Sequence, residues 1–368
     1  MRKFFAHSPF VSGPTSSSGR SRKSTPTSLL LLSAVVLLLP WLAACGGDGR
    51  TPLVLYSPHG RDLLGLFEKT FEEQNPDIDV RWLDMGSQEV YDRIRSEAVN
   101  PQADVWFGGP ATILARGVKD GLLTPFRPTW ADAVAESGRH PEDYFFSLYR
   151  TPPILVFNED AVTPEDAPKT WDELLDPKWE NKIIIRDPLA SGTMRTIFGM
   201  VLAQSVTETG DTAQGFDWLR QLDAQTKEYA QNPALLHLKM ERQEGVVTCW
   251  ELTDILFQRD RGAPLGYHFP ADGSPVIEDS VGLVKGAPHE EAAKRFIEWA
   301  GSVEAQTLAV EQAFRLPART DMPAEDLPEW AQQALDQLVT ADVDWSLLDQ
   351  HGAEWINAWD RDVRAEGK

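Results

Sequence analysis

Short runs of strand-forming residues alternate with amphipathic helical patterns from residue 53 onward, and few folds accommodate that order. The strand-like runs cover 53–56, 78–83 and 104–107, and the helical patterns between them cover 62–74 and 88–98. A strand, helix, strand order of this kind predicts a parallel, doubly wound sheet with helices on both faces.

The break after each of these strands is polar or rich in glycine. The three breaks read Ser57-Pro58-His59-Gly60, Met85-Gly86-Ser87 and Gly108-Gly109-Pro110. Ligands of open α/β sheets bind beyond the carboxyl ends of the strands, where these loops are expected to lie.

Two extended segments divide the chain into two lobes. The first, 148–157, contains Pro152 and Pro153, which a helix interior does not tolerate. The second, 276–284, is expected to cross back. We therefore predict an α/β fold with two hinged lobes, each a doubly wound sheet flanked by helices: lobe I from 52–150 plus 276–368, and lobe II from 151–275.

The tail to Arg364 has a helical pattern, in which three tryptophans are the expected packing residues: Trp345, Trp355 and Trp359.

The first 44 residues have the features of an export signal. Basic residues precede an apolar run from Leu29 to Leu39, and LAAC follows at 42–45. The run is shorter than the roughly 20 residues of a membrane-spanning helix. We predict a signal peptide over 1–44 and a tether over 45–51, with an uncleaved signal anchor as the alternative.

Charge and cysteine content exclude several classes of protein. The formal charge is −21, and removal of the five basic residues of the leader takes it to −26. Nucleic acid and anionic membrane surfaces are therefore unsuitable partners. The cysteines are Cys45 and Cys249, so no disulfide within the mature domain and no cysteine-based metal cluster is expected. Cys249 follows an apolar run and is expected in the core.

The segment Asp187-Pro188-Leu189-Ala190-Ser191-Gly192-Thr193 follows an apolar strand and precedes a helical pattern. Backbone N–H groups at a helix start lack partners within the helix, so together with the Ser191 and Thr193 hydroxyls they can bind an anion. The alternative is an ordinary serine or threonine cap.

Three other loops carry candidate ligand contacts. Gly86-Ser87 repeats the same arrangement before the helix at 88–98. Ser57 and His59 follow the first strand, although a loop histidine can also be a surface residue. Trp250 and Glu251 follow the strand at 246–249, where Trp250 can floor the site or pack in the core, and Glu251 can accept hydrogen bonds from a ligand or solvate a helix start.

No motif of a catalytic site is present, whether a nucleophile elbow, a phosphate-binding loop or a zinc-binding HExxH. We expect no catalytic residue, metal or cofactor. An enzyme on the same frame would have to use His59 with Glu251 or Asp254.

The chain resembles the periplasmic solute-binding proteins of ABC importers, in the branch of ferric-iron and hexose-phosphate or phosphonate binders. The similar segments span 52–320: LVLYSPHG at 53–60, NPDIDVRW at 75–82, PQADVWFGG at 101–109, TWDELLDPKWENKI at 170–183, DPLASGT at 187–193 and VGLVKGAPHEEAAKRFIEW at 281–299. The leader likewise resembles a bacterial lipobox, which implies lipidation of Cys45.

The resemblance implies a type II two-lobed fold that closes on its ligand. Six residues then stand where this branch lines its cleft: Ser57, Ser87, Gly109, Ser191, Gly192 and Thr193. It further implies a monomer, anchored by lipid in the periplasm or on the outer face of a membrane, that delivers its ligand to a permease and ATPase complex.

The expected ligand is a small organic anion such as a sugar phosphate or phosphonate. Iron binders of this branch commonly use a consecutive pair of tyrosines, where this chain has Cys249-Trp250-Glu251, and none of its six tyrosines are adjacent. Ferric iron remains the alternative ligand.

Overall fold

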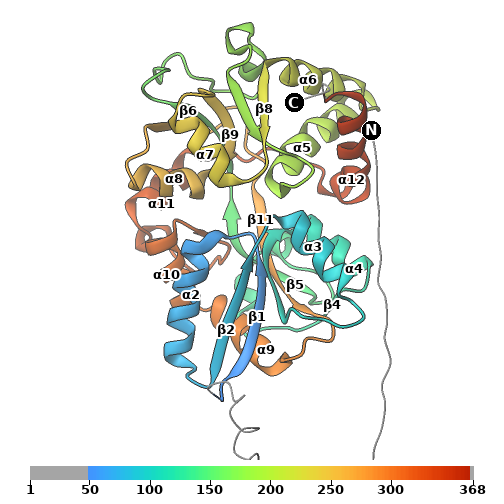
Figure 1. The fold of residues 1–368 in the computed structure, drawn as a ribbon, viewed down its shortest axis with the longest axis vertical. Helices are drawn as coiled ribbons and strands as arrows, with labels where there is room; N and C mark the ends of the chain where they lie inside the picture. Colours follow the sequence, from blue (N-terminus) through green and yellow to red (C-terminus); the bar gives the residue numbers. More distant parts are fainter. Residues whose placement is uncertain (1–48, 365–368) are drawn as a thin grey trace, which may run out of the picture. The chain divides into compact units, whose positions relative to one another are not determined.

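The structure is a computed structural model that describes residues 49–364. The predicted signal peptide and the predicted lipidation site, Cys45, lie outside this range. Within it, no helix is long and apolar enough to cross a membrane. Two β-sheets, each flanked by helices, form the two lobes (Figure 1).

Seven strands form the sheet of lobe I, in the order β12-β5-β11-β3-β1-β2 with β4 paired to β11. They are β1 (Thr51–Ser57), β2 (Ile78–Asp84), β3 (Val105–Pro110), β4 (Leu123–Thr124), β5 (Phe145–Thr151), β11 (Ile277–Val284) and β12 (Leu316–Pro317). β1 is parallel to β2 and β3, as predicted, whereas β11 runs antiparallel to β3, β4 and β5. The sheet is therefore mixed, with a parallel half that leads into the loops of interest.

Alternation along β1 explains why helices cover both faces of this sheet. Leu53 and Leu55 pack in one core cluster and Tyr56 in another, because successive side chains of a strand point to opposite faces. The helices on the first face are α2 (Gly60–Gln74), α9 (Glu290–Ala300) and α10 (Val303–Ala313), and those on the second are α3 (Ser87–Ser96) and α4 (Ala111–Lys119).

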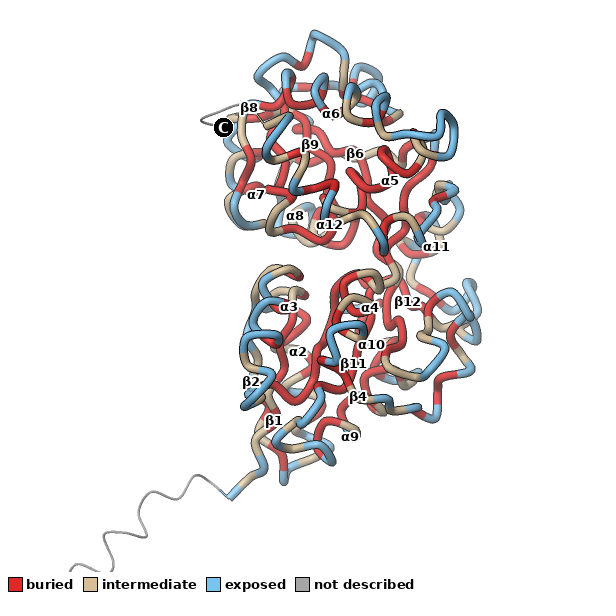
Figure 2. Tube along the Cα trace, turned by 90° about the vertical axis from the view of Figure 1, so that its right-hand side faces the viewer, coloured by how far each residue is buried: buried red, intermediate tan, exposed pale blue. Residues whose placement is uncertain are grey.

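Five strands form the sheet of lobe II, in the order β10-β6-β9-β7-β8. They are β6 (Pro153–Asn158), β7 (Ile183–Arg186), β8 (Thr226–Ala230), β9 (Val247–Glu251) and β10 (Leu265–His268). The helices between them are α5 (Gly192–Thr209), α6 (Ala213–Gln225), α7 (Pro233–Glu241) and α8 (Leu252–Asp260). Buried residues fill the interior of each lobe (Figure 2).

The chain crosses between the lobes within or next to the two extended segments, 148–157 and 276–284. β5 ends at Thr151 in the first sheet and β6 begins at Pro153 in the second, so Pro152 separates the two lobes. β11 returns the chain to the first sheet. The single residue between β5 and β6 is a connection typical of a hinge, whereas residues 269–276 join β10 to β11 at the second crossing.

The C-terminal helices differ from the expected division, which placed all of 276–368 in lobe I. Helices α11 (Glu329–Gln337) and α12 (Trp345–Asp362) contribute to the core cluster of lobe II. The Trp359 ring lies 5.2 Å from those of Phe198 and Tyr229, measured between centroids. Burying Trp355 and Trp359 against α5 holds α12 in lobe II, whereas Trp345 is 37 % exposed and is not a packing residue.

Trp359 and Trp345 allow this packing to be tested within one helix. Trp359→Ala should lower the free energy of unfolding by about 3–5 kcal/mol, because it empties a fully buried site. Trp345→Ala, the matched control, should change it by about 0.5 kcal/mol or less. Urea unfolding measures both values, and equal effects would show that α12 is not packed as described.

Candidate functional site

A cleft of about 800 Å³ is lined by residues of both lobes. Within residues 49–364, six helices begin at its wall, each directly after a strand: α2, α3, α4, α5, α7 and α8. This is the arrangement that the polar breaks after the strands predicted. Eight of the nine predicted ligand contacts line the cleft: His59, Ser87, Gly109, Ser191, Gly192, Thr193, Trp250 and Glu251.

The start of α5 presents hydrogen-bond donors to the cleft. Ser191 is its N-cap, and the Ser191 Oγ accepts a hydrogen bond from the Met194 N–H at 3.2 Å. Because that oxygen acts as an acceptor, its own hydrogen remains available to a ligand. Gly192 and Thr193 add backbone N–H groups of the first helical turn, which carries the positive end of the helix dipole. The same segment can therefore cap α5 and donate hydrogen bonds to an anion.

The start of α3 in lobe I meets the start of α5 in lobe II. A Cβ atom added to Gly192 would lie 3.0 Å from the Ser87 Oγ and 2.9 Å from the Pro110 Cδ. A Cβ atom added to Gly86 would lie 2.9 Å from the Ala190 carbonyl oxygen. Only glycine allows this close approach, so the two lobes touch where the donors of both gather.

His59 is buried at the base of the cleft. Its Nε2 lies 3.0 Å from the Asp279 Oδ2, and its ring packs edge-on against Phe107 and Tyr149. The Gly109 N–H donates a hydrogen bond to the other oxygen of Asp279. The amide of Gly109 is therefore already satisfied, and Asp279 is a cleft residue that sequence reasoning missed.

Ser57 is placed differently from the expectation. It is fully buried, and its Oγ accepts a hydrogen bond from the His59 N–H at 3.2 Å. Ser57 does not line the cleft among the described residues. It supports the loop that carries His59.

Two arginines of the cleft wall were also missed. Arg186 ends β7 and donates to the Ala230 carbonyl oxygen at 3.0 Å, and Arg315 precedes β12 and donates to the His59 carbonyl oxygen at 3.1 Å. Both are nearly fully buried, and the Nε of each lacks a partner within the described chain. The sequence offers one signal for Arg186, which is its place at the end of a strand. No feature of the sequence marks Arg315 as a cleft residue.

Carboxylates outnumber cations in the described cleft wall, with seven against three arginines: Asp62, Asp84, Glu89, Glu241, Glu251, Asp254 and Asp279. Burial, together with the negative charges of Asp254 and Asp279, raises the pKa of Glu251 to about 8. Burial also raises the pKa of Asp84. These groups can accept hydrogen bonds from hydroxyls or an ammonium group, and a protonated Glu251 can donate one as well.

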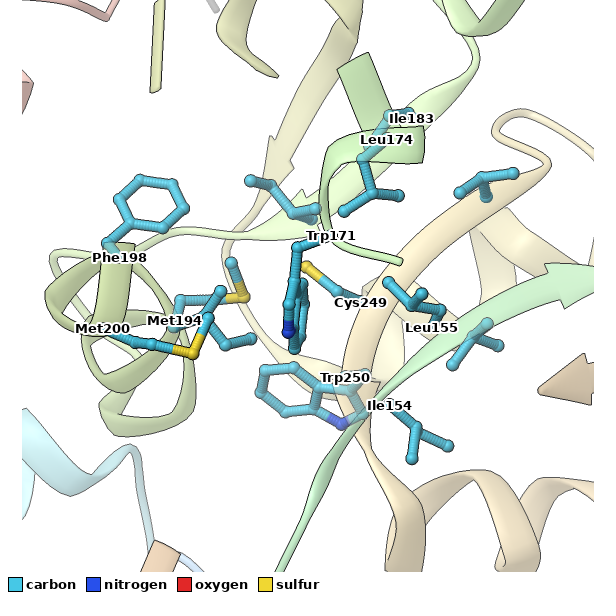
Figure 3. Packing of buried hydrophobic residues seen from close by; sticks show 14 of the residues in the cluster. Ile154, Leu155, Trp171, Leu174, Ile183, Met194, Phe198, Met200, Cys249 and Trp250 are labelled. Carbon is cyan, nitrogen blue, oxygen red and sulfur yellow. The ribbon is translucent and has the colours of Figure 1, made fainter. Parts of the chain in front are cut away.

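Trp250 combines both roles that the sequence left open. It is 3 % exposed and belongs to the core cluster of lobe II with Trp171 and Cys249 (Figure 3). Its Nε1 donates to the Asp254 Oδ2 at 2.9 Å, and part of it lines the cleft. Cys249 is fully buried, as predicted, and burial raises the pKa of its thiol to about 12.

The raised pKa of Glu251 determines how the stability of the protein should change with pH. Between its ordinary value of 4.5 and about 8, the folded state holds a proton that the unfolded state has released. The stability that this group contributes is therefore lost as the pH rises through that range. In urea unfolding at a series of pH values, Glu251→Gln should lose less stability than the wild type between about pH 5 and pH 8.

Glu311→Gln, at an exposed position of α10, is the matched control and should follow the wild-type profile. A Glu251→Gln profile parallel to the wild type would contradict the raised pKa.

Comparison with known proteins places these features in a family. A family model described as bacterial extracellular solute-binding protein matches residues 68–336. A Sinorhizobium fredii protein named as a candidate ABC transporter periplasmic-binding protein is 25 % identical over 313 residues, covering 85 % of this chain and 86 % of its own. A Salmonella typhimurium protein named as a candidate 2-aminoethylphosphonate-binding periplasmic protein is 27 % identical, covering 78 % and 84 %.

Iron uptake protein A1 of Synechocystis is also 27 % identical, covering 77 % of this chain and 82 % of its own. Among solved structures, the periplasmic binding protein AfuA of Actinobacillus pleuropneumoniae with bound fructose-6-phosphate superimposes with a TM-score of 0.75. It is 26 % identical, and the match covers 86 % of this chain and 99 % of AfuA. The chain belongs to the family of bacterial extracellular solute-binding proteins and is the periplasmic solute-binding component of an ABC import system.

Proposed function

We propose that the cleft binds a small organic phosphate or phosphonate, which the protein delivers unchanged to the permease and ATPase of its importer. One observation carries this proposal: the starts of α3 and α5, from opposite lobes, meet in the cleft with the hydroxyls of Ser87, Ser191 and Thr193 beside them. An anion held by both helix starts would stabilise the closed arrangement, because its contacts to one lobe are lost when the lobes separate.

The carboxylates of the cleft suit the body of such a ligand. Glu251 and Asp254 can accept hydrogen bonds from sugar hydroxyls or from an ammonium group. The negative charge of the whole chain does not exclude an anion, since oriented N–H groups act at short range and distant carboxylates are screened by salt. Relatives named for phosphonate binding and a similar structure that holds a sugar phosphate support this class of ligand.

A thermal-shift series tests the ligand, with glucose 6-phosphate, 2-aminoethylphosphonate, inorganic phosphate and ferric citrate as probes. An organophosphate at about 100 times its Kd should stabilise the protein by about 2.7 kcal/mol. Ser191→Ala should reduce that stabilisation, because it removes a hydroxyl donor from the anion site.

Ser302→Ala is the matched control, since Ser302 caps α10 with the same geometry, accepting from the Ala305 N–H at 3.2 Å. Each substitution should cost about 1 kcal/mol of stability as a lost helix cap. Only Ser191→Ala should weaken the response to ligand, and a shift with ferric citrate alone would overturn the proposal.

The donor chemistry favours an organic anion over ferric iron. Ferric iron prefers hard anionic oxygen donors, which iron binders of this branch commonly supply from tyrosines. In residues 49–364 no tyrosine lines the cleft, and no group of three or more histidine, cysteine or acidic side chains is arranged to hold a metal ion.

Binding without chemistry is the function that we assign to the cleft. The sequence offered one enzyme candidate, His59 acting with Glu251 or Asp254. In residues 49–364 the His59 Nε2 pairs with Asp279, and no hydrogen bond joins His59 to either of those two carboxylates. Recovery of an unaltered ligand after prolonged incubation with the protein checks this point, and any turnover would contradict it.

The export and anchoring of the protein follow from its leader. We expect cleavage before Cys45 and lipidation of that residue, so that a monomer is tethered in the periplasm or on the outer face of a membrane. Cells expressing the protein should incorporate labelled palmitate into it, and Cys45→Ser should abolish the label. A labelled Cys45→Ser protein would place the lipid elsewhere.

A further inference from the structure

Asp187 organises the loop that carries the donors of lobe II. Its carbonyl oxygen accepts hydrogen bonds from the N–H groups of Ala190 at 3.1 Å and Ser191 at 3.0 Å. Its side-chain Oδ1 accepts one from the Leu189 N–H at 2.9 Å. Three of the four residues that follow Asp187 are thus held by this one residue, and the position of Ser191 depends on its orientation.

The other carboxylate oxygen of Asp187 is held from a distant part of the chain. Arg364, two residues beyond the end of α12, donates to the Asp187 Oδ2 at 2.7 Å, and Gln231 donates to the same oxygen at 3.1 Å. Asp187 is 4 % exposed, so little water competes for that oxygen. The ion pair joins positions that are 177 residues apart in sequence.

Arg364 is itself fixed by the core of lobe II. Its guanidinium carbon lies 4.7 Å from the centroid of the Tyr229 ring and 5.2 Å from that of Trp359. Asp360, one turn earlier, accepts a hydrogen bond from its NH1 at 3.0 Å. An arginine held between aromatic rings and two carboxylates loses less freedom on pairing than a mobile surface arginine would.

The contact with Arg364 helps to lower the pKa of Asp187. Burial alone would raise the pKa of Asp187, but the hydrogen bonds from Arg364, Leu189 and Gln231 hold it below its ordinary value. Loss of Arg364 would leave this buried carboxylate without its cationic partner, which weakens the contacts that Asp187 makes inside the loop as well.

We propose that Arg364 is a positioning residue for the anion-binding loop: by pairing with Asp187 it holds residues 187–193 in the conformation that presents Ser191 and Gly192 to the cleft. The consequence for ligand affinity rests on the proposed function, whereas the consequence for the loop does not. The C-terminal helix of the chain is then part of the binding machinery, although Arg364 does not line the cleft.

Hydrogen exchange in the ligand-free protein tests the effect on the loop. In Arg364→Ala, the amides of residues 189–191 should exchange about tenfold faster or more, because a charge-assisted contact that orients their acceptor is lost. Peptides of β1 and β9 should keep their wild-type rates. Arg364→Lys retains the charge and should restore part of the protection.

Asp360→Ala is the matched control, since it removes the other carboxylate partner of Arg364 and leaves the pair with Asp187 in place. Its loop should exchange at the wild-type rate. Unchanged loop exchange in Arg364→Ala, or faster exchange spread equally over both lobes, would overturn the positioning role.

Calorimetric titration with glucose 6-phosphate and 2-aminoethylphosphonate tests the effect on binding. Arg364→Ala should bind the probe that the wild type accepts about tenfold more weakly, the scale expected for one charge-assisted contact. Unchanged affinity beside faster loop exchange would show that the loop conformation does not serve binding. If the wild type binds neither probe, the proposed ligand class fails, and hydrogen exchange still decides the role of Arg364.

Discussion

The first N–H groups of a helix have no partner within it, and six helices of the described chain begin at the same cleft. Each follows a strand, so the connectivity of the two sheets forces these donors to one place. The cleft therefore carries oriented dipoles from both lobes before any ligand arrives. Where α3 and α5 meet, Gly86 allows its backbone to approach the Ala190 carbonyl oxygen, and Gly192 leaves room for the Ser87 and Pro110 side chains. The donors of the two lobes therefore lie close together.

The charged side chains of the cleft differ in whether they already have a partner. Arg186 and Arg315 are buried beside carboxylates rather than paired with them, and each donates to a backbone carbonyl oxygen. Asp279 is satisfied by His59 and by the Gly109 amide, whereas Glu251 is left with a raised pKa. A ligand with an anionic end and a hydrogen-bonding body matches this division of charge. A ferric ion does not.

Local features were predictable from the sequence because their causes are local. The strand and helix order, the proline break at Pro152 and the Ser191 cap each depend on a few neighbouring residues, and the structure contains all three. Local sequence also limits the segment Asp172–Leu175 to a 3-10 turn, since Pro177 follows two residues later and disfavours helical continuation.

Features that depend on distant contacts were not predictable. Arg315 enters the cleft through a hydrogen bond to the carbonyl of His59, 256 residues earlier in the chain. The assignment of α12 to lobe II depends on Trp359 reaching Phe198 and Tyr229. Ser57 looked like Ser87 in sequence, yet only the structure shows that its side chain turns inward. Nothing in the spacing of these residues reveals such pairings.

A crystal structure of the protein with a bound organophosphate would show whether both lobes hold the anion. We expect the phosphate or phosphonate oxygens to lie within hydrogen-bond distance of Ser87 in lobe I and of the Ser191 to Thr193 segment in lobe II. An anion held by one lobe alone, or bound through a metal ion away from these helix starts, would contradict it.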